Sequence, residues 1–430
     1  MADSSAAPAP PGSYFIETLG CPKNQVDSDK LEGTLIADGM TAADSAEQAD
    51  LIVVNTCAFI EEAREESIHT ILALDHNRAD SAKLVVTGCM AERYGDELAE
   101  ALPEADSIAG FGVPVTIGSK PTGSDAPLLD LLHLPRPPSR SPWAYVKIAE
   151  GCDRNCGFCA IPTFRGPQRS RTIDDICAEV DQLQAKEIVL VAQDLAAFGR
   201  DQGQGERSIV PLIQAVSKRS DWVRLLYLYP SDLNDGLIDA ICETGVPYFD
   251  LSLQHVSKPL MRRMRRWGGS DVFLERIATI RKREPDAAFR SNFIVGYPGE
   301  TEEDHDALID FVEQARLDWC GFFSYSKEDG TYAADLDGQV ESGLVSERLS
   351  ELREIQDLIT EEKRDEMIGR EVKVLVDEIG VARSHREAPE IDGVVAVSSD
   401  LVVGSFATVT IENAAGPDLH AVGASETPAL

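Results

Sequence analysis

Short apolar runs alternate with helix-like stretches along most of the chain, and this alternation restricts the fold more than any other feature. In the first third the strand candidates are SYFIETLG, DLIVVNT and KLVVTG, and residues 27–39 and 60–75 have helical spacing of apolar side chains. From Trp143 onward the candidates are AYVKIAE, EIVLVAQD, VRLLYLYP, FDLSLQH, FRSNFIVGYPG and CGFFSYS. Because strands that alternate with helices form parallel sheets, we predict an α/β protein with an N-terminal parallel-sheet domain. The six later units predict a central, partial (βα)6 barrel rather than a closed eight-stranded one.

Changes in composition mark the domain boundaries. At 430 residues the chain is too long for one ordinary hydrophobic core. We expect a disordered tail at 1–11, an N-terminal domain at 12–122, a linker rich in Pro, Ser and Gly at 123–140, and the barrel at 141–366. Short strand-like segments separated by Gly or Asp then predict a small C-terminal antiparallel β-barrel at 369–430.

The chain is strongly acidic. It has 74 Asp and Glu against 40 Lys and Arg, a formal net charge of −34. Such a field repels phosphate backbones and attracts basic proteins, although adaptation of a whole proteome to salt would produce the same excess. The C-terminal domain has ten acidic and four basic side chains, whereas a β-barrel that binds RNA is normally basic. We therefore expect no direct nucleic-acid contact.

Neither the first residues nor the apolar runs predict a targeting or membrane segment. The first residues, MADSSAAPAPPG, have neither the basic start nor the apolar stretch of a signal peptide. The longest apolar runs, such as LIVV before Asn55, are far shorter than the roughly 20 residues that span a bilayer. We predict a soluble, cytoplasmic protein with no membrane contact, in which the nine cysteines are metal ligands, nucleophiles or buried thiols rather than disulfides.

Three cysteines with the spacing C-x3-C-x2-C, namely Cys152, Cys156 and Cys159, follow the first strand candidate of the barrel. Closely spaced thiolates bind zinc or iron–sulfur clusters. Structural zinc needs four protein ligands, and the next cysteine, Cys177, lies in a helical stretch well past this loop. A cubane cluster on three thiolates would leave one iron open, so we favour a cluster that coordinates a substrate or cofactor.

Cys21, Cys57 and Cys89 each come directly after a strand candidate and before a helix candidate. Parallel strands present their carboxyl ends at one edge of a sheet, so these thiols are expected to converge on a second three-cysteine site. Three unrelated buried cysteines are the alternative, but that alternative does not predict the shared position after a strand.

The cysteine motif, with Phe158 before its last cysteine, resembles the signature of the radical S-adenosylmethionine (SAM) enzymes. Together with the three domains it resembles the methylthiotransferases, whose C-terminal barrel is called the TRAM domain. TLGCPKNQVDSD, EGCDRNCGFCAIP, NFIVGYPGETEED and EAPEIDG resemble the branch that modifies an aspartate of ribosomal protein S-12. The resemblance implies two 4Fe-4S clusters, an auxiliary one on the three N-terminal cysteines and a catalytic one on the barrel motif.

The resemblance also implies a mechanism and partners. One SAM would methylate a sulfur at the auxiliary cluster, and a second SAM, cleaved at the barrel cluster, would supply the radical that removes the aspartate Cβ hydrogen. The carbon radical would then take the methylthio group. Expected partners are protein S-12, free or in the small subunit, a reductant such as flavodoxin or ferredoxin, and a sulfur donor; we expect a monomer. A transfer-RNA adenosine methylthiotransferase and a non-catalytic iron–sulfur carrier are the alternatives.

Several polar residues fall where strand candidates end and are candidate SAM contacts. Gln193, with Asp194, could instead cap the next helix, and His255, beside Gln254, could be a structural histidine. The full candidate set is Phe158, Gln193, Gln254, Arg290, Asn292, Val295 and Gly296.

Two further features receive structural interpretations. We interpret the basic run RRMRR, residues 262–266, as a solvated helix face that offsets nearby acidic side chains. Cys177, Cys242 and Cys320 lie in apolar contexts and are interpreted as packed thiols.

Overall fold

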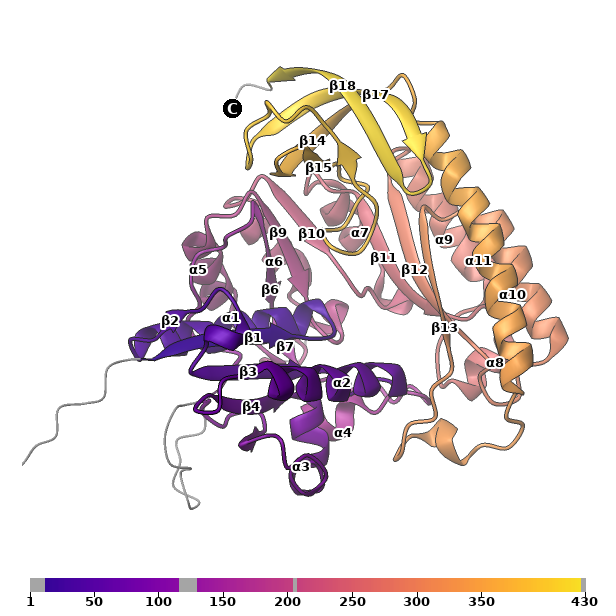
Figure 1. The fold of residues 1–430 in the computed structure, drawn as a ribbon. Helices are drawn as coiled ribbons and strands as arrows, with labels where there is room; N and C mark the ends of the chain where they lie inside the picture. The colour runs from indigo at the N-terminus through magenta and orange to yellow at the C-terminus, as the bar shows by residue number, and fades with distance from the viewer. Residues whose placement is uncertain (1–11, 116–129, 204–206, 427–430) are drawn as a thin grey trace, which may run out of the picture. The chain divides into compact units, whose positions relative to one another are not determined.

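The computed structural model describes residues 12–115, 130–203 and 207–426, which form two compact units divided after Pro137 (Figure 1). The first unit is an all-parallel sheet with the strand order β2-β1-β3-β4-β5, so the predicted N-terminal parallel sheet is confirmed. Its central strand is buried along its whole length, as expected for a sheet covered on both faces. The strands are β1 (Ser13–Thr18), β2 (Thr41–Ala42), β3 (Leu51–Thr56), β4 (Lys83–Gly88) and β5 (Ser107–Ala109), and the helices are α1 (Pro22–Ala37), α2 (Glu61–Asn77) and α3 (Cys89–Ala101).

The second unit begins with six parallel strands. They form two three-stranded sheets, β10-β9-β6 and β11-β12-β13, which meet at a single parallel bridge between Leu228 and Leu251. Among the described strands β6 and β13 do not pair, so the predicted partial barrel is confirmed. The strands are β6 (Trp143–Lys147), β9 (Glu187–Val191), β10 (Trp222–Leu225), β11 (Tyr248–Gln254), β12 (Ala288–Val295) and β13 (Trp319–Ser324).

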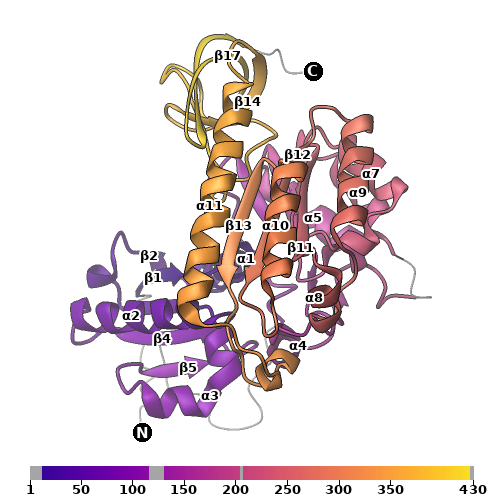
Figure 2. The ribbon, with the colours of Figure 1, turned by 90° about the vertical axis from the view of Figure 1, so that its right-hand side faces the viewer.

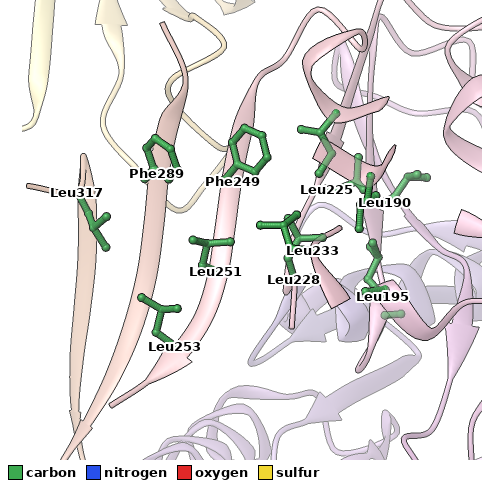
Figure 3. Packing of buried hydrophobic residues seen from close by; sticks show 14 of the residues in the cluster. Leu190, Leu195, Leu225, Leu228, Leu233, Phe249, Leu251, Leu253, Phe289 and Leu317 are labelled. Atoms are coloured by element: carbon green, nitrogen blue, oxygen red, sulfur yellow. The ribbon is translucent and has the colours of Figure 1, made fainter. Parts of the chain in front are cut away.

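Helices cover the outer face of these strands. Helices α10 and α11 run side by side next to β12 and β13 (Figure 2). Between the strands and helices lies one continuous apolar core, in which Leu225, Leu251 and the stacked rings of Phe249 and Phe289 come from neighbouring strands (Figure 3). The helices are α5 (Ile173–Leu183), α6 (Ile209–Val216), α7 (Asp235–Cys242), α8 (Lys258–Arg263), α9 (Ser270–Arg283), α10 (Glu302–Ala315) and α11 (Ser342–Asp365).

The C-terminal strands close into a small barrel with the order β14-β15-β16-β18-β17. The prediction that this barrel is antiparallel is wrong for one pair, because β16 and β18 run parallel, with Val395 opposite Leu419. The reason is geometric: strand direction cannot alternate all the way around a closed ring of five. The strands are β14 (Glu371–Glu378), β15 (Val381–Arg383), β16 (Val395–Ala396), β17 (Phe406–Ala415) and β18 (Asp418–Glu426).

Residues 383–392, here called the closing segment, lie against the amino-terminal parts of the six barrel strands. Each strand contributes a contact. The contacts are Tyr145 Oη to the Pro389 carbonyl (2.9 Å), Glu187 to Arg383 (2.8 Å), Arg224 to the His385 carbonyl (2.9 Å), Tyr248 Oη to Asp392 (2.6 Å), Arg290 to Asp392 (3.4 Å) and Trp319 Nε1 to the Arg386 carbonyl (2.7 Å). The C-terminal domain therefore closes the end of the barrel opposite to the one where parallel α/β folds bind ligands.

Within the described ranges, no helix is both long and apolar enough to cross a membrane.

Candidate functional site

Three thiols occupy one edge of the N-terminal sheet. Cys21 precedes α1, Cys57 follows β3, and Cys89 begins α3 directly after β4. Since β1, β3 and β4 are adjacent and parallel, all three cysteines lie at their carboxyl ends. Gly20 has a φ of +95°, and a Cβ added there would lie 3.0 Å from Cys57 Sγ. The loop before Cys21 thus packs directly onto Cys57, and only glycine allows this approach.

Asn24 connects the three loops. It is fully buried one turn after Cys21, and its Nδ2 donates to the carbonyls of Leu19 (2.9 Å) and Thr56 (3.0 Å). Its Oδ1 lies 3.6 Å from Cys89 Sγ. The structure therefore brings together the loops that carry Cys21, Cys57 and Cys89, as the positions after strands predicted.

The barrel thiols lie in the loop between β7 (Ala149–Glu150) and α4 (Ile161–Arg165). The Gly157 amide donates to the Met264 carbonyl (2.8 Å), and a Cβ at Gly157 would lie 2.7 Å from Tyr297 Oη. The Cys159 amide donates to the Cys156 carbonyl at 3.2 Å. This loop is therefore pinned against the turn after α8, and its backbone conformation is fixed by the barrel.

Burial disfavours a bare negative charge on Cys152 and Cys159. It raises the pKa of Cys152 to about 11 and that of Cys159 to about 12, and the neighbouring cysteines add to both shifts. The Arg154 amide offers partial compensation, since it donates to Cys152 Sγ at 3.4 Å. Bound iron would supply the missing positive charge and hold the ligands as thiolates.

The chemistry of the two donor sets fits iron–sulfur clusters. None of the nine cysteines is in a disulfide. Among the described side chains, no group of three or more His, Cys, Asp and Glu is arranged around a point where a single metal ion would sit. A cluster does not need such convergence, because each thiolate binds a different iron atom.

Asp194 and Asp232 hold the guanidinium of Arg154, two residues after Cys152. Asp194 Oδ2 accepts from Arg154 Nε at 2.6 Å, and Asp232 pairs with the same guanidinium. Asp194 makes no side-chain cap of the helical turn that follows it. Asp194 therefore does not cap the next helical turn, which was one of the two roles considered for it. Its carboxylate instead orients Arg154 of the cluster loop.

Gln193 lies at the same carboxyl end, after β9. Its Nε2 donates to Glu150 Oε1 at 2.7 Å, while its Oε1 is buried and accepts no hydrogen bond from the described residues. Although burial raises the pKa of Glu150, Arg165 (2.8 Å) and Lys147 (2.7 Å) outweigh it and hold that pKa well below its usual range. Gln193 thus presents an acceptor that a ligand's N–H or O–H could satisfy.

Gln254 ends β11 with a φ of +70°, after a shift in strand register between Leu251 and Gln254. His255 is fully buried, its Nδ1 accepts from the Ser257 amide (3.1 Å), and burial lowers its pKa to about 4. His255 is therefore a neutral, packed histidine near pH 7, which fits the structural interpretation. Phe158 packs against the barrel core.

Candidates on β12 divide between the two ends of the strand. Gly296, at the carboxyl end after buried Val295, donates its amide to Glu300 Oε2 at 2.6 Å. Arg290 lies six residues earlier, about 20 Å along an extended strand. It pairs with Asp250 (3.4 Å) and with Asp392 of the closing segment. The structure therefore does not place Arg290 with the cluster loop.

Asn292 lies between these two positions. A Cβ at Gly321 of the adjacent strand would lie 2.5 Å from Asn292 Oδ1, so the glycine makes room for this amide.

Comparison with known proteins agrees with this architecture. Residues 13–110 match the model of the Uncharacterized protein family UPF0004, residues 146–312 the Radical SAM superfamily, and residues 368–423 the TRAM domain. The ribosomal protein uS12 methylthiotransferase RimO of Kineococcus radiotolerans is 40% identical, over 95% of this chain and 96% of that protein. Its counterpart in Moorella thermoacetica is 43% identical, over 92% and 95%. The chain belongs to the ribosomal protein uS12 methylthiotransferase family.

The family assignment made from the motifs is thus confirmed. Among solved structures, the radical SAM methyltransferase TsrM of Kitasatospora setae, with cobalamin and a [4Fe-4S] cluster bound, aligns with a TM-score of 0.48 at 13% identity. That alignment covers 75% of this chain and 76% of the other.

In this member of the methylthiotransferase family, the structure corrects our interpretation of the basic run RRMRR. Arg262 and Arg265 are exposed, as predicted, but Arg263 and Arg266 are half-buried. Arg266 Nη1 donates to Cys156 Sγ at 3.2 Å. Sequence patterns revealed neither this contact nor the one made by Asn24. For Asn24 the available signal was its position three residues after Cys21, whereas Arg266 is 110 positions from Cys156.

Proposed function

We propose that this chain attaches a methylthio group to Cβ of an aspartate in ribosomal protein uS12 by SAM-dependent radical chemistry. The observation that carries the proposal is the pair of three-thiol sets, in a chain related to uS12 methylthiotransferases over 95% of its length. One set lies at the carboxyl ends of three parallel strands, and the other lies in the single loop between β7 and α4. Aspartate Cβ–H is not acidic enough for polar substitution, so removal of that hydrogen requires a radical.

Two 4Fe-4S clusters are proposed, one for each thiol set. Cys152, Cys156 and Cys159 would hold the cluster that binds SAM at its open iron, and Cys21, Cys57 and Cys89 would hold the auxiliary one. When bound, the barrel cluster supplies the electron that cleaves SAM. The protein's part is to orient the cofactor and exclude water. Proposed SAM contacts are Phe158, Gln193, Gln254, Asn292, Val295 and Gly296.

The domain division follows from these roles. Residues 12–122 would carry the auxiliary site, 123–140 the linker, 141–366 the radical site, and 369–430 the TRAM barrel. The acidic surplus of the chain supports a basic ribosomal protein as its substrate rather than RNA. We further propose that the protein acts as a cytoplasmic monomer, with a one-electron reductant such as flavodoxin or ferredoxin and a separate sulfur donor.

The test is an anaerobic reaction of the reconstituted, reduced protein with SAM, sulfide and uS12, followed by peptide mass spectrometry. We expect a methylthio increment on one aspartate together with 5′-deoxyadenosine. Cys156→Ala should abolish both products and Cys21→Ala the methylthio product. Cys242→Ala, which removes a thiol outside both sets, is the matched control and should retain both.

Formation of 5′-deoxyadenosine without modification of uS12 would contradict the proposed substrate, and transfer RNA would be tested next. Absence of 5′-deoxyadenosine from a protein with its full complement of iron would contradict the radical mechanism itself.

A further inference from the structure

We propose that Arg266 is a positioning residue that raises the reduction potential of the barrel cluster, and so favours uptake of the electron that the reaction needs. The inference rests on the proposed function, because it assumes a cluster on Cys152, Cys156 and Cys159. It extends that function by assigning a role to a residue outside the cysteine motif.

The guanidinium of Arg266 is held in place on three sides. Nη1 donates to Cys156 Sγ at 3.2 Å, and Nη2 donates to the Ser252 carbonyl in β11. One face of the guanidinium lies over the Tyr229 ring, 4.3 Å from its centroid. A planar cation fixed in this way directs an N–H group at one sulfur rather than spreading its interaction over solvent.

The turn that presents Arg266 also holds the cluster loop. Helix α8 ends at Arg263, and Arg265 then adopts a φ of +54°, a conformation that non-glycine residues seldom take. This reversal lets the Arg266 amide donate to the Met261 carbonyl at 2.8 Å, while the Met264 carbonyl accepts from Gly157 at 2.8 Å. Because the same turn anchors both partners, the distance from Arg266 to Cys156 is set by the backbone.

A second arginine near the same thiols shows why Arg266 is distinctive. Arg154 lies 3.8 Å from the centroid of the same Tyr229 ring, but Asp194 and Asp232 neutralise its charge. Across the described part of the chain, no carboxylate lies within ion-pair distance of Arg266. Its positive charge therefore acts on the thiolates without a nearby counterion.

Charge and hydrogen bonding at sulfur fix the direction of the effect. On reduction the cluster gains one electron from an external one-electron donor, its net charge becomes more negative by one, and no protein bond breaks. A nearby cation and an N–H···S bond both stabilise the more negative state, so both raise the potential. Removal of Arg266 should make the cluster harder to reduce.

The test is a redox titration of the reconstituted full-length protein with dithionite and mediators, followed by electron paramagnetic resonance. Arg266→Met removes charge and hydrogen bond, Arg266→Gln removes only the charge, and Arg266→Lys keeps the charge. We expect Arg266→Met to lower the equilibrium constant for reduction roughly tenfold, equivalent to about 59 mV for a one-electron couple. Arg266→Gln should fall between Arg266→Met and wild type, and Arg266→Lys closest to wild type. Exposed Arg262, in the same basic run, provides the control Arg262→Gln, which should not shift the potential.

The titration is then repeated in a variant that has alanine at Cys21, Cys57 and Cys89. In that variant only the barrel thiols remain as cluster ligands, so the signal belongs to the barrel cluster. An unchanged potential in Arg266→Met at wild-type iron content would overturn the inference. Equal iron loss in Arg266→Lys and Arg266→Met, without a shift in the remaining signal, would also overturn it, since that pattern reflects structural damage alone.

The inference and the proposed function can fail separately. A shifted potential in a protein that does not modify uS12 would support the role of Arg266 and contradict only the substrate. Failure of the wild-type protein to form a barrel cluster would overturn both.

Discussion

The two ends of the barrel satisfy their polar groups in different ways. At the amino-terminal end, buried charges form ion pairs: Glu187 binds both Arg224 (2.6 Å) and Arg383 of the closing segment (2.8 Å). At the carboxyl end, the Gln193 Oε1 acceptor has no partner among the described residues, and the Arg266 charge faces a thiol. The first end is built to be stable and the second is left incomplete for a ligand, a division expected for α/β barrels.

The largest effect on stability is expected from Glu187→Ala. The side chains of Glu187 and Arg224 are fully buried, so the substitution leaves Arg224 as a buried cation without a carboxylate partner, whereas Arg383 keeps Asp377. Loss of one partner from such a pair costs about 3–5 kcal/mol, which urea unfolding would measure. The matched control is Lys186→Ala, which breaks a half-exposed pair with Asp221 and should cost less than about 1 kcal/mol. Similar costs for the two variants would contradict the description of this end as the stabilising one.

A pH-dependent effect of intermediate size is expected from Asp392→Asn. Burial raises the pKa of Asp392 to about 6, although Arg290 opposes the shift. In the unfolded chain the pKa of an aspartate is about 3.9, so between pH 4 and 6 the folded protein binds a proton at Asp392 that the unfolded chain does not. Protonated Asp392 therefore adds to the free energy of unfolding below pH 4, by about 3 kcal/mol at most. This stabilisation is lost as the pH rises through 6.

We thus expect the stability of wild type relative to Asp392→Asn to fall between pH 4 and pH 7. Urea unfolding of both proteins at those two pH values provides the measurement, and the difference between them cancels titration of other groups. A difference that does not change with pH would show that Asp392 stays ionised in the folded barrel.

A smaller effect, on binding rather than stability, is expected from Gln193→Ala at the carboxyl end. Glu150 keeps Lys147 and Arg165 as partners, so the free energy of unfolding should change by only about 1 kcal/mol. If Gln193 makes the proposed hydrogen bond to SAM, its loss should raise KM for SAM about tenfold, measured by 5′-deoxyadenosine formation. An unchanged KM would show that Gln193 only supports Glu150.

Local patterns in the sequence were sufficient to predict the three domains and the six cysteines at strand ends. Apolar periodicity distinguishes strands from helices, and parallel connection places consecutive strand ends on one edge. For that reason Cys21, Cys57 and Cys89 could be grouped although 32 or more residues separate each from the next. The motif EAPEIDG indicated the family, but not that residues 383–392 close the barrel.

Contacts between distant residues depended on the tertiary structure. Arg266 and Cys156 are 110 positions apart in the sequence. Helical spacing in the run RRMRR indicates which arginines lie on the same face of a helix, but not which residues that face contacts. Arg290 and Gly296 belong to one strand pattern, yet the strand's length places them at opposite ends of the barrel. The parallel β16–β18 pair followed from closure of five strands into a ring. Short-range periodicity is set by backbone geometry and can be predicted from the residue order, whereas such contacts form only when packing brings separate elements together.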